Sequence, residues 1–285
     1  DRLYMGPIRQ AFRYHPCRHA DIEFWCTSVN FSTLTNLDVS PAEFGEISGI
    51  FAIFLLANLI IGALLLRLFR LEIGAFLPAL SFPNNGNMGL PLCLFAYGTA
   101  GLGVASAIAA VIILLHFTIG IFLASKKFSI MILVKNGPIY GILVSIIFLY
   151  FEWDVPGYLE NTTFLLTYTT IFLVLMALGV ALTRLKVVSW THAAILGAVR
   201  VVLGPIIGFA AIKFLNLDGF MAGVLLIQSA MPSAVLTYLV GSMYSKKRAV
   251  DNIASVIVSS TLMLSLIHIS EPTRRTPISY AVFCL

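Results

Sequence analysis

The sequence predicts an all-α membrane protein that crosses the bilayer many times, and three observations support this fold class. Hydrophobic residues make up 59% of the 285 residues, charged residues only 11%, and the mean hydropathy is +0.95. Long apolar stretches follow one another with short connections, and two of these stretches are interrupted by proline and small polar residues. Because no soluble domain of this length tolerates such a composition, we expect one polytopic membrane domain.

The two ends of the chain differ from the rest. Residues 264–285 contain LSLIHISEPTR and ISYAVFCL, which resemble a translated sequencing adaptor, and we interpret them as an adaptor-derived tail. Residues 1–30 have mixed charges and no apolar span, and we interpret them as a frameshifted or non-native segment. The transmembrane domain is therefore expected to cover residues 31–263, with its N-terminal helices missing or scrambled.

Eight apolar stretches within residues 31–263 are predicted to span the membrane. Most have about the 20 residues that a helix needs to cross the hydrocarbon core. The predicted spans are 47–66, 73–97, 104–124, 138–151, 163–183, 191–215, 219–243 and 250–266.

The connections between these spans alternate in charge. The basic connections carry Arg67 and Arg70; Lys126, Lys127 and Lys135; Arg184 and Lys186; and Lys246, Lys247 and Arg248. The connections between them are uncharged, acidic or balanced. By the positive-inside rule, the basic connections are expected to face the cytoplasm. The net charge of +5 is thus explained by topology, and we expect no nucleic-acid partner.

The first interruption is the segment SFPNNGNMGLPL, residues 81–92, inside the second predicted span. Pro83 lacks a backbone N–H and clashes with the preceding turn, while Gly86, Gly89 and the asparagines weaken a helix further. If this interruption were the only one, a structural kink would be the simpler explanation. However, non-helical backbone at bilayer depth must be covered by protein or line a cavity, so the segment is also a candidate site.

A second interruption, residues 228–234 (QSAMPSA), lies in the seventh predicted span. Each interrupted span is followed by one more helix, and residues 138–266 form a five-helix unit. Since five is odd, two consecutive units of this kind insert with opposite orientations. Paired interruptions in two inverted halves are typical of a transporter site near the bilayer midplane. The matching triplets are Phe82-Pro83-Asn84 and Met231-Pro232-Ser233.

These two segments resemble the auxin efflux carrier family of permeases, which includes plant PIN-type carriers and bacterial malate and malonate carriers. The resemblance rests on SFPNNGNMGLPL with the glycine-rich residues 98–103, and on AMPSAVLTYLVGSMYS with the Ser/Thr-rich residues 255–261. It implies two inverted five-helix repeats, similar to the bile acid symporter fold, whose proline-broken helices cross. The short connection at residues 126–137 favours a bacterial member, in the inner (plasma) membrane.

The residues themselves favour an anionic ligand. A broken helix presents a new N-terminus in mid-membrane, and two such ends suit a negatively charged group. No Asp or Glu lies in the middle of a predicted span, so a cationic ligand is not supported. We expect Asn84 and Ser233 to cap the half-helices or to touch the ligand. The residues expected to bind substrate are Pro83, Asn84, Asn85, Asn87, Arg200, Gln228, Pro232, Ser233 and Thr237.

Arg200 needs a partner, because a charge in the middle of a span costs roughly 2.5–3.5 kcal/mol on insertion scales. Two interpretations are open. Arg200 attracts the anion or steadies an unwound segment, or it is a structural arginine bonded to helix carbonyls.

Other polar residues receive simpler interpretations. His116 is interpreted as a packing histidine and Asn58 as a contact between helices. Residues 101–103 (GLG) are predicted to form a tight connection between spans. The four cysteines show no metal or disulfide spacing, so we expect no metal site.

The expected function is that of a secondary active transporter of small organic anions, such as carboxylates, working by alternating access. The alternative is a membrane-embedded enzyme or a ligand sensor without transport. We expect no catalytic residues and no cofactor, and the coupling ion, H⁺ or Na⁺, stays open. The expected partners are the anion, the lipid bilayer and a second copy of the chain.

Overall fold

The computed structural model describes residues 31, 41–125, 137–151, 153–185 and 190–269, and these residues form helices and one isolated β-bridge. In chain order the elements are α3 (Pro41–Leu68), α4 (Ile73–Ser81), the π-helix η1 (Asn85–Gly89), α5 (Leu90–Leu115), the π-helix η2 (His116–Gly120), α6 (Ile121–Ser125), α8 (Gly137–Tyr150), α9 (Gly157–Arg184), α10 (Trp190–Phe214), α11 (Gly219–Ala230), α12 (Val235–Tyr244) and α13 (Lys247–Ile269). The predicted non-native segment 1–30 and residues 270–285 of the predicted tail lie outside the described residues.

Five stretches of the described chain are long and apolar enough to cross a bilayer. They are Phe44–Leu68, Asn85–Ala124, Gly157–Val180, Trp190–Phe214 and Lys247–Leu266. The predicted span 138–151 coincides with α8, and the predicted span 219–243 coincides with the broken pair α11 and α12. Each of these three helices is shorter than the five long stretches and is therefore not among them. The protein is therefore a multi-pass, helical membrane protein.

The turn between the second and third predicted spans lies at Gly98, and not at residues 101–103 as predicted. Gly98 has φ 65° and ψ −154° within α5, a conformation that glycine adopts without the penalty of a Cβ atom. Gly101, Leu102 and Gly103 are buried in the part of α5 that follows this turn. The helix is thus interrupted before the glycine pair, at the one residue of α5 with non-helical φ and ψ.

Helix α3 shows how a mostly apolar sequence produces two faces. Its exposed side chains Ile53, Leu56, Ile60 and Leu64 recur every three or four residues, which places them on one side of the helix. Its opposite side buries Phe51, Phe54, Leu55, Asn58 and Leu66. An exposed apolar face is favourable in lipid, so the buried polar Asn58 is the informative residue of this helix.

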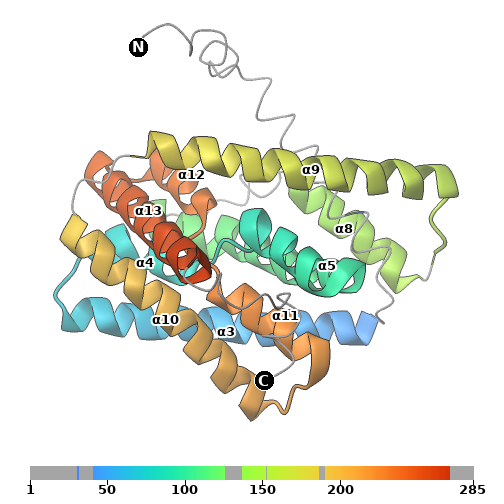
Figure 1. Ribbon diagram of the computed structural model, residues 1–285, viewed down its shortest axis with the longest axis horizontal. Coiled ribbons are helices and arrows are strands. Elements are labelled where there is room, and N and C mark those ends of the chain that lie inside the picture. The colour runs from blue at the N-terminus through green and yellow to red at the C-terminus, as the bar shows by residue number, and fades with distance from the viewer. Residues whose placement is uncertain (1–30, 32–40, 126–136, 152, 186–189, 270–285) are drawn as a thin grey trace, which may run out of the picture.

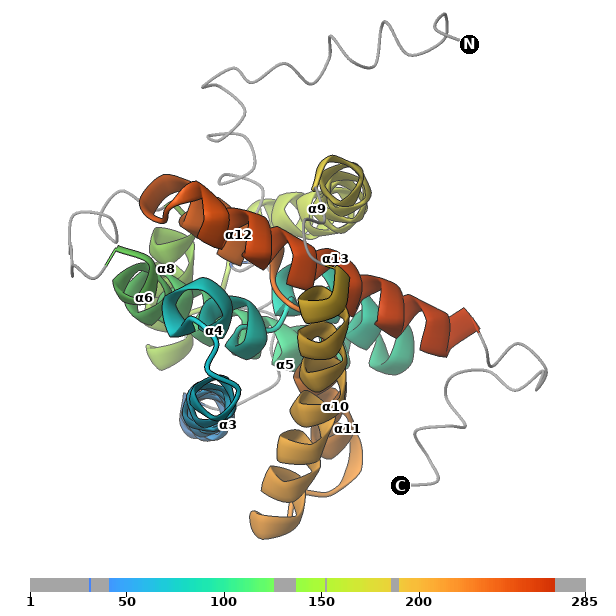
Figure 2. The same cartoon turned by 90° about the vertical axis from the view of Figure 1, so that its left-hand side faces the viewer.

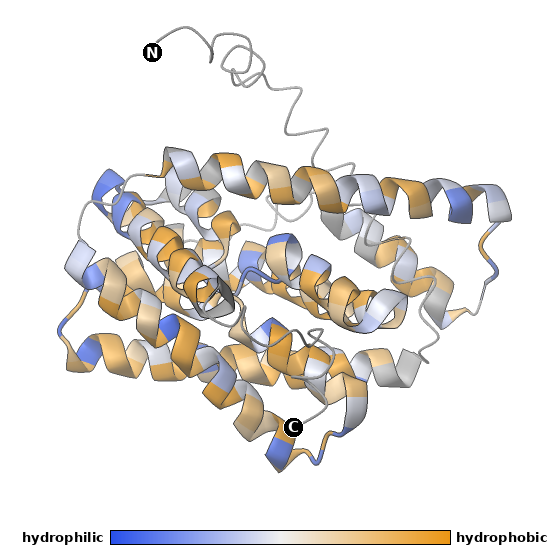
Figure 3. Cartoon of the chain, in the orientation of Figure 1, coloured by the Kyte–Doolittle hydropathy of each residue, from blue (hydrophilic) through white to orange (hydrophobic). Residues whose placement is uncertain are grey.

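The basic connections that border described helices lie at one end of the molecule, while the predicted basic connection with Lys126, Lys127 and Lys135 lies outside the described residues. In Figure 1 the α3–α4 connection, the end of α9, the start of α10 and the α12–α13 connection are all at the left, whereas the α8–α9 connection is at the right. Figure 3 shows hydrophobic helix bodies with hydrophilic residues mainly at their ends. This arrangement agrees with the predicted alternation of charge and with a common cytoplasmic end.

Helices α10 and α11 lie side by side, and α13 packs across α10 and α4 (Figure 2). Glycines of α10 allow these close approaches. A Cβ atom at Gly197 would meet Ser259 and Ser260 of α13, and Cβ atoms at Gly204 and Gly208 would overlap the carbonyl and the side chain of Ser229 in α11. Small residues at contacts between membrane helices let backbones approach, since apolar side chains gain little by leaving lipid.

The Gly204→Ala variant is expected to lose stability for this reason. The new methyl group would overlap the Ser229 carbonyl oxygen, a backbone atom that cannot move aside cheaply. Overpacking of this kind costs about 1–3 kcal/mol, and it should lower the melting temperature of the detergent-solubilised protein. Gly49→Ala in α3 is the matched control, because a Cβ atom at Gly49 meets nothing within 4 Å. Equal melting temperatures for the two variants would contradict this packing.

Candidate functional site

Both predicted interruptions are present as breaks between helices. Helix α4 ends at Ser81 and η1 begins at Asn85; α11 ends at Ala230 and α12 begins at Val235. The backbone is extended at Phe82 (φ −87°, ψ 113°) and at Ala234 (φ −67°, ψ 131°). Proline at positions 83 and 232 explains why neither helix continues, since proline has no N–H to donate to the preceding turn.

The two breaks contact each other through their backbones. Pro83 and Ser233 form an antiparallel β-bridge. The Asn84 N–H donates to the Pro232 carbonyl at 2.8 Å, and the Ala234 N–H donates to the Phe82 carbonyl at 2.9 Å. Each break therefore satisfies backbone groups that the other has lost, as non-helical backbone at membrane depth requires. We call residues 82–84 and 232–234 the crossing.

Ser233 is attached to both sides of the crossing. Its hydroxyl donates to the Ala79 carbonyl of α4 at 2.5 Å, and its N–H donates to the Ser260 hydroxyl of α13 at 3.2 Å. The prediction that Asn84 and Ser233 cap the following half-helices is wrong: the Asn84 side chain makes no cap hydrogen bond, and the N-cap of α12 is Ala234. Ser233 instead binds a carbonyl near the C-terminal end of α4. The other half of that prediction, contact with a ligand, stays a prediction.

Several buried polar atoms beside the crossing have no hydrogen-bond partner among the described residues. They are Asn84 Nδ2, both side-chain polar atoms of Asn85, and Gln228 Oε1. The three side chains are 3%, 0% and 0% exposed. Gln228 also lies against the Cα atom of Gly89 and donates weakly to Cys93 Sγ at 3.6 Å. Asn87, another predicted site residue, is half-buried in η1.

Arg200 of α10 is fully buried and binds backbone atoms next to the crossing. Its Nε and Nη2 donate to the Met231 carbonyl at 3.2 and 3.0 Å, and Nη2 also donates to the Ser229 carbonyl at 3.2 Å. Its Nη1 donates to Asn58 Oδ1 at 3.1 Å. These contacts, to carbonyls at the C-terminal end of α11 where the helix dipole is negative, fit both an arginine that steadies the unwound segment and a structural arginine bonded to helix carbonyls. Attraction of an anion by Arg200 stays a prediction.

Two residues with simple sequence interpretations also belong to this region. Asn58 connects α3 to Arg200, as a helix-to-helix contact, and accepts a hydrogen bond from Ser81 at its backbone carbonyl. His116 packs its ring on Phe82, with centroids 4.3 Å apart, and its Nε2 lies 3.3 Å from the Thr237 hydroxyl. Their polar character in mid-span was visible in the sequence, but Arg200 lies 142 residues from Asn58 along the chain and Thr237 lies 121 residues from His116.

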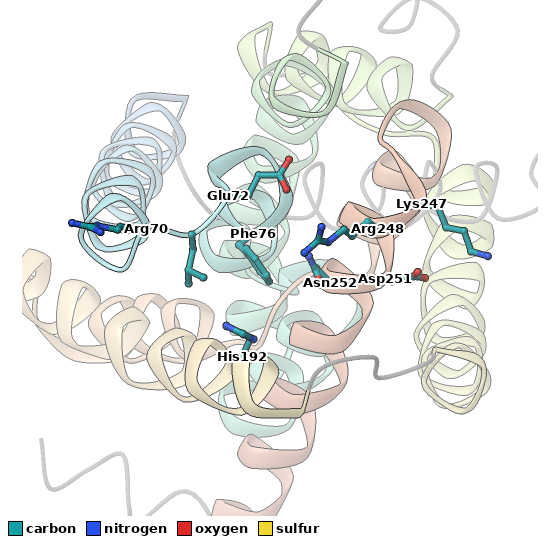
Figure 4. Close-up of a pocket in the computed structure, with 9 residues that line it drawn as sticks. Arg70, Glu72, Phe76, His192, Lys247, Arg248, Asp251 and Asn252 are labelled. Carbon is teal, nitrogen blue, oxygen red and sulfur yellow. The ribbon is translucent and has the colours of Figure 1, made fainter.

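The crossing is separate from a surface hollow of about 640 Å³ at the basic end of the molecule. Figure 4 shows the side chains of Arg248, His192 and Phe76 around this hollow, whereas Arg70 and Lys247 point away from its centre. The hollow is also lined by Leu71, Glu72, Asp251 and Asn252. None of its lining residues is a predicted site residue, so the hollow does not change the assignment of the site.

Two comparisons with known proteins bear on these features. A family model described as "Membrane transport protein" matches residues 121–270, which include α6 and α8–α13 and therefore the second break. The chain is also 24% identical to an uncharacterised transporter of the archaeon Methanocaldococcus jannaschii, in an alignment that covers 76% of each protein. An archaeal relative does not support the predicted bacterial origin, which stays a prediction.

Proposed function

This chain belongs to the membrane transport protein family, the family of the auxin efflux carriers that its motifs resemble, and from this premise we propose that it is a secondary carrier of small organic anions. The proposed mechanism is alternating access, with the crossing as the place where the anion is held. We further propose that the carrier works in a plasma membrane, with its basic connections on the cytoplasmic side.

The observation that carries this proposal is the group of unpartnered polar atoms beside the crossing. A buried polar atom without a partner costs about 1–3 kcal/mol, so a ligand that supplies the missing hydrogen bonds gains affinity. The amide nitrogens of Asn84 and Asn85 are donors suited to a carboxylate, while the oxygens of Asn85 and Gln228 accept from a hydroxyl. A small carboxylic acid that carries a hydroxyl group offers both kinds of partner.

The charges near the crossing support an anion rather than a cation. Helices η1 and α12 begin directly after the breaks, and their N-terminal ends carry partial positive charge and free N–H groups. Arg200 is the only charged side chain among the buried residues that the structure describes. A negatively charged ligand therefore enters a region of net positive potential, which is favourable where water is excluded.

The arrangement of helices supports an inverted repeat and hence alternating access. The bridge between the breaks is antiparallel, as two oppositely oriented halves require. In addition, α5, which follows the first break in the chain, packs on α11, which precedes the second break. In the same way α13, which follows the second break, packs on α4, which precedes the first break. Helices α8 and α9 contact this crossed bundle through α5 and η1. We propose that the bundle rocks against α8 and α9.

The test is uptake of labelled malate, malonate and indole-3-acetate into proteoliposomes that contain the full chain. We expect at least one of these anions to be taken up. Asn84→Ala should weaken the apparent affinity by about 10- to 100-fold, because a hydrogen bond to a charged group contributes about 1.5–3 kcal/mol.

Asn161→Ala is the control, since Asn161 is exposed near the N-terminal end of α9. It should transport as the unaltered protein does. Failure to move any organic anion under any gradient would refute the proposed function, and equal effects of the two substitutions would refute the assignment of the crossing as the site.

A further inference from the structure

A buried histidine in the π-helix η2 touches both broken segments. His116 is 1% exposed, and its ring packs on the ring of Phe82, in the first break, with centroids 4.3 Å apart. Its Nε2 lies 3.3 Å from the hydroxyl of Thr237, in the first turn of α12 after the second break. Single-turn π-helices occur frequently at functional sites, and this one places the imidazole against both segments.

The other ring nitrogen of His116 has no hydrogen-bond partner among the described residues. His116 Nδ1 is buried and unpaired. Packing on Phe82 does not require a polar atom, because a phenylalanine ring would fill the same place and leave no buried polar atom unpaired. A neutral imidazole carries one N–H, so one of its nitrogens keeps a lone pair that can take up a second proton. The polar character of this residue is therefore a feature that packing does not explain.

The surrounding helices supply no negative charge to a protonated His116. In the described part of the chain, η2 packs against α5, α6 and α12, and Phe82 follows α4. These four helices contain no Asp, Glu, Lys or Arg. Their other titratable side chains are Cys93, Tyr97, Tyr238 and Tyr244. Arg200, which reaches the crossing from α10, has the same sign as an imidazolium. A proton on His116 is therefore costly unless an anion is present, because a buried charge needs a partner.

The carried anion supplies that partner. In the proposed function it is held beside the crossing, and His116 contacts the crossing through Phe82 and the following half-helix through Thr237. Opposite charges attract strongly where water is excluded, so the anion lowers the cost of the proton. By thermodynamic linkage the proton raises the affinity for the anion by the same factor.

We propose that His116 binds a proton together with the carried anion, so that the carrier works as a proton symporter. The proton comes from water on the side to which the site is open and adds to the lone pair of a ring nitrogen. It returns to water on the other side when the anion leaves. No other bond changes, and one positive charge accompanies each anion. This inference rests on the proposed transport function and specifies its coupling.

The experiment measures proton movement and anion uptake in the same proteoliposomes, which contain the full chain and a trapped pH-sensitive dye. The anion is whichever of malate, malonate and indole-3-acetate the unaltered protein takes up, and protein-free liposomes give the baseline for passive diffusion. Addition of the anion should acidify the interior. A gradient of one pH unit, acidic outside, should accumulate the anion by about tenfold, because one proton accompanies each anion.

His116→Gln should separate the two movements. Glutamine can still form a hydrogen bond with Thr237, but it takes up no proton. The folded variant should continue to exchange labelled for unlabelled anion, while the dye signal and the accumulation of about tenfold are lost. His192→Gln is the control, because His192 is exposed near the start of α10, outside the crossing. It should keep proton and anion movement coupled.

Anion uptake without proton movement in the unaltered protein would overturn the inference and leave the proposed function intact. Persistent coupling in folded His116→Gln would also overturn it, because the proton would then travel on the anion or on another group. So would the loss of exchange together with accumulation, since His116 would then be needed for the anion itself. If the glutamine variant does not fold, His116→Phe, which keeps a ring against Phe82, takes its place. If no anion is taken up at all, the proposed function fails, and this inference fails with it.

Discussion

Arg200→Met is expected to cause the largest loss of stability of any single substitution considered in this protein. Methionine has a similar length and suits an apolar site, but it cannot donate to the carbonyls of Ser229 and Met231 or to Asn58. Each of these buried acceptors then loses its partner, at about 1–3 kcal/mol each. We expect a combined loss of about 3 kcal/mol or more, measured as a lower melting temperature in detergent.

The control for this substitution is Lys213→Met, at the exposed end of the same helix. It removes a charge from water rather than from a buried hydrogen-bond network and should change stability by less than about 0.5 kcal/mol. Arg200→Lys should be intermediate, because a lysine keeps the charge but lacks the planar fork that reaches two carbonyls and an amide together. A melting temperature of Arg200→Met equal to that of the unaltered protein would exclude Arg200 as the group that holds the second break.

Ala234→Pro is expected to reduce transport strongly while the helices remain. Ala234 has φ −67°, which a proline ring accepts, so the local backbone is not strained. However, proline has no N–H for the Phe82 carbonyl, and its Cδ atom would replace the amide hydrogen that now points at that carbonyl. The two breaks should therefore separate, and uptake into proteoliposomes should fall by about tenfold or more, since one lost buried hydrogen bond alone costs about 1–3 kcal/mol.

Val235→Pro is the matched control for this second substitution. Val235 is the first residue of α12, where the N–H has no partner within the helix and proline is tolerated. Both variants should keep the helical circular dichroism of the unaltered protein. Normal uptake by Ala234→Pro would mean that the bridge between the breaks does not position the site.

Much of the site was predictable because its strongest signals are local. Proline removes a backbone donor wherever it occurs, and Pro83 and Pro232, each with small or polar neighbours, marked both breaks in the sequence, whereas Pro205 alone is accommodated inside α10. Arg200 was equally visible, since a buried charge in a membrane needs a partner. The charge pattern of the connections predicted that the basic ones share one side, and the described ends of α3, α9, α10, α12 and α13 that border three of them do lie at one end of the molecule.

The partners of these residues were not predictable. Nothing near Ser233 in the sequence indicates that its hydroxyl binds Ala79, 154 residues earlier, rather than its own half-helix. Likewise, the sequence left open whether Arg200 attracts an anion, steadies an unwound segment or binds helix carbonyls, because this depends on which groups lie beside it in space. The turn lies at Gly98, instead of at residues 101–103, and three glycines within six residues did not indicate in the sequence which of them adopts the positive φ.

The sequence by itself thus determined that this protein is a multi-pass helical membrane protein with two broken helices, because composition and proline act locally. Only the tertiary structure decided that the two breaks bind each other through their backbones and that Arg200 donates to the second of them. The physical reason is that hydrogen bonds lost within a helix must be replaced at bilayer depth, and the replacement comes from whichever segment the fold brings close.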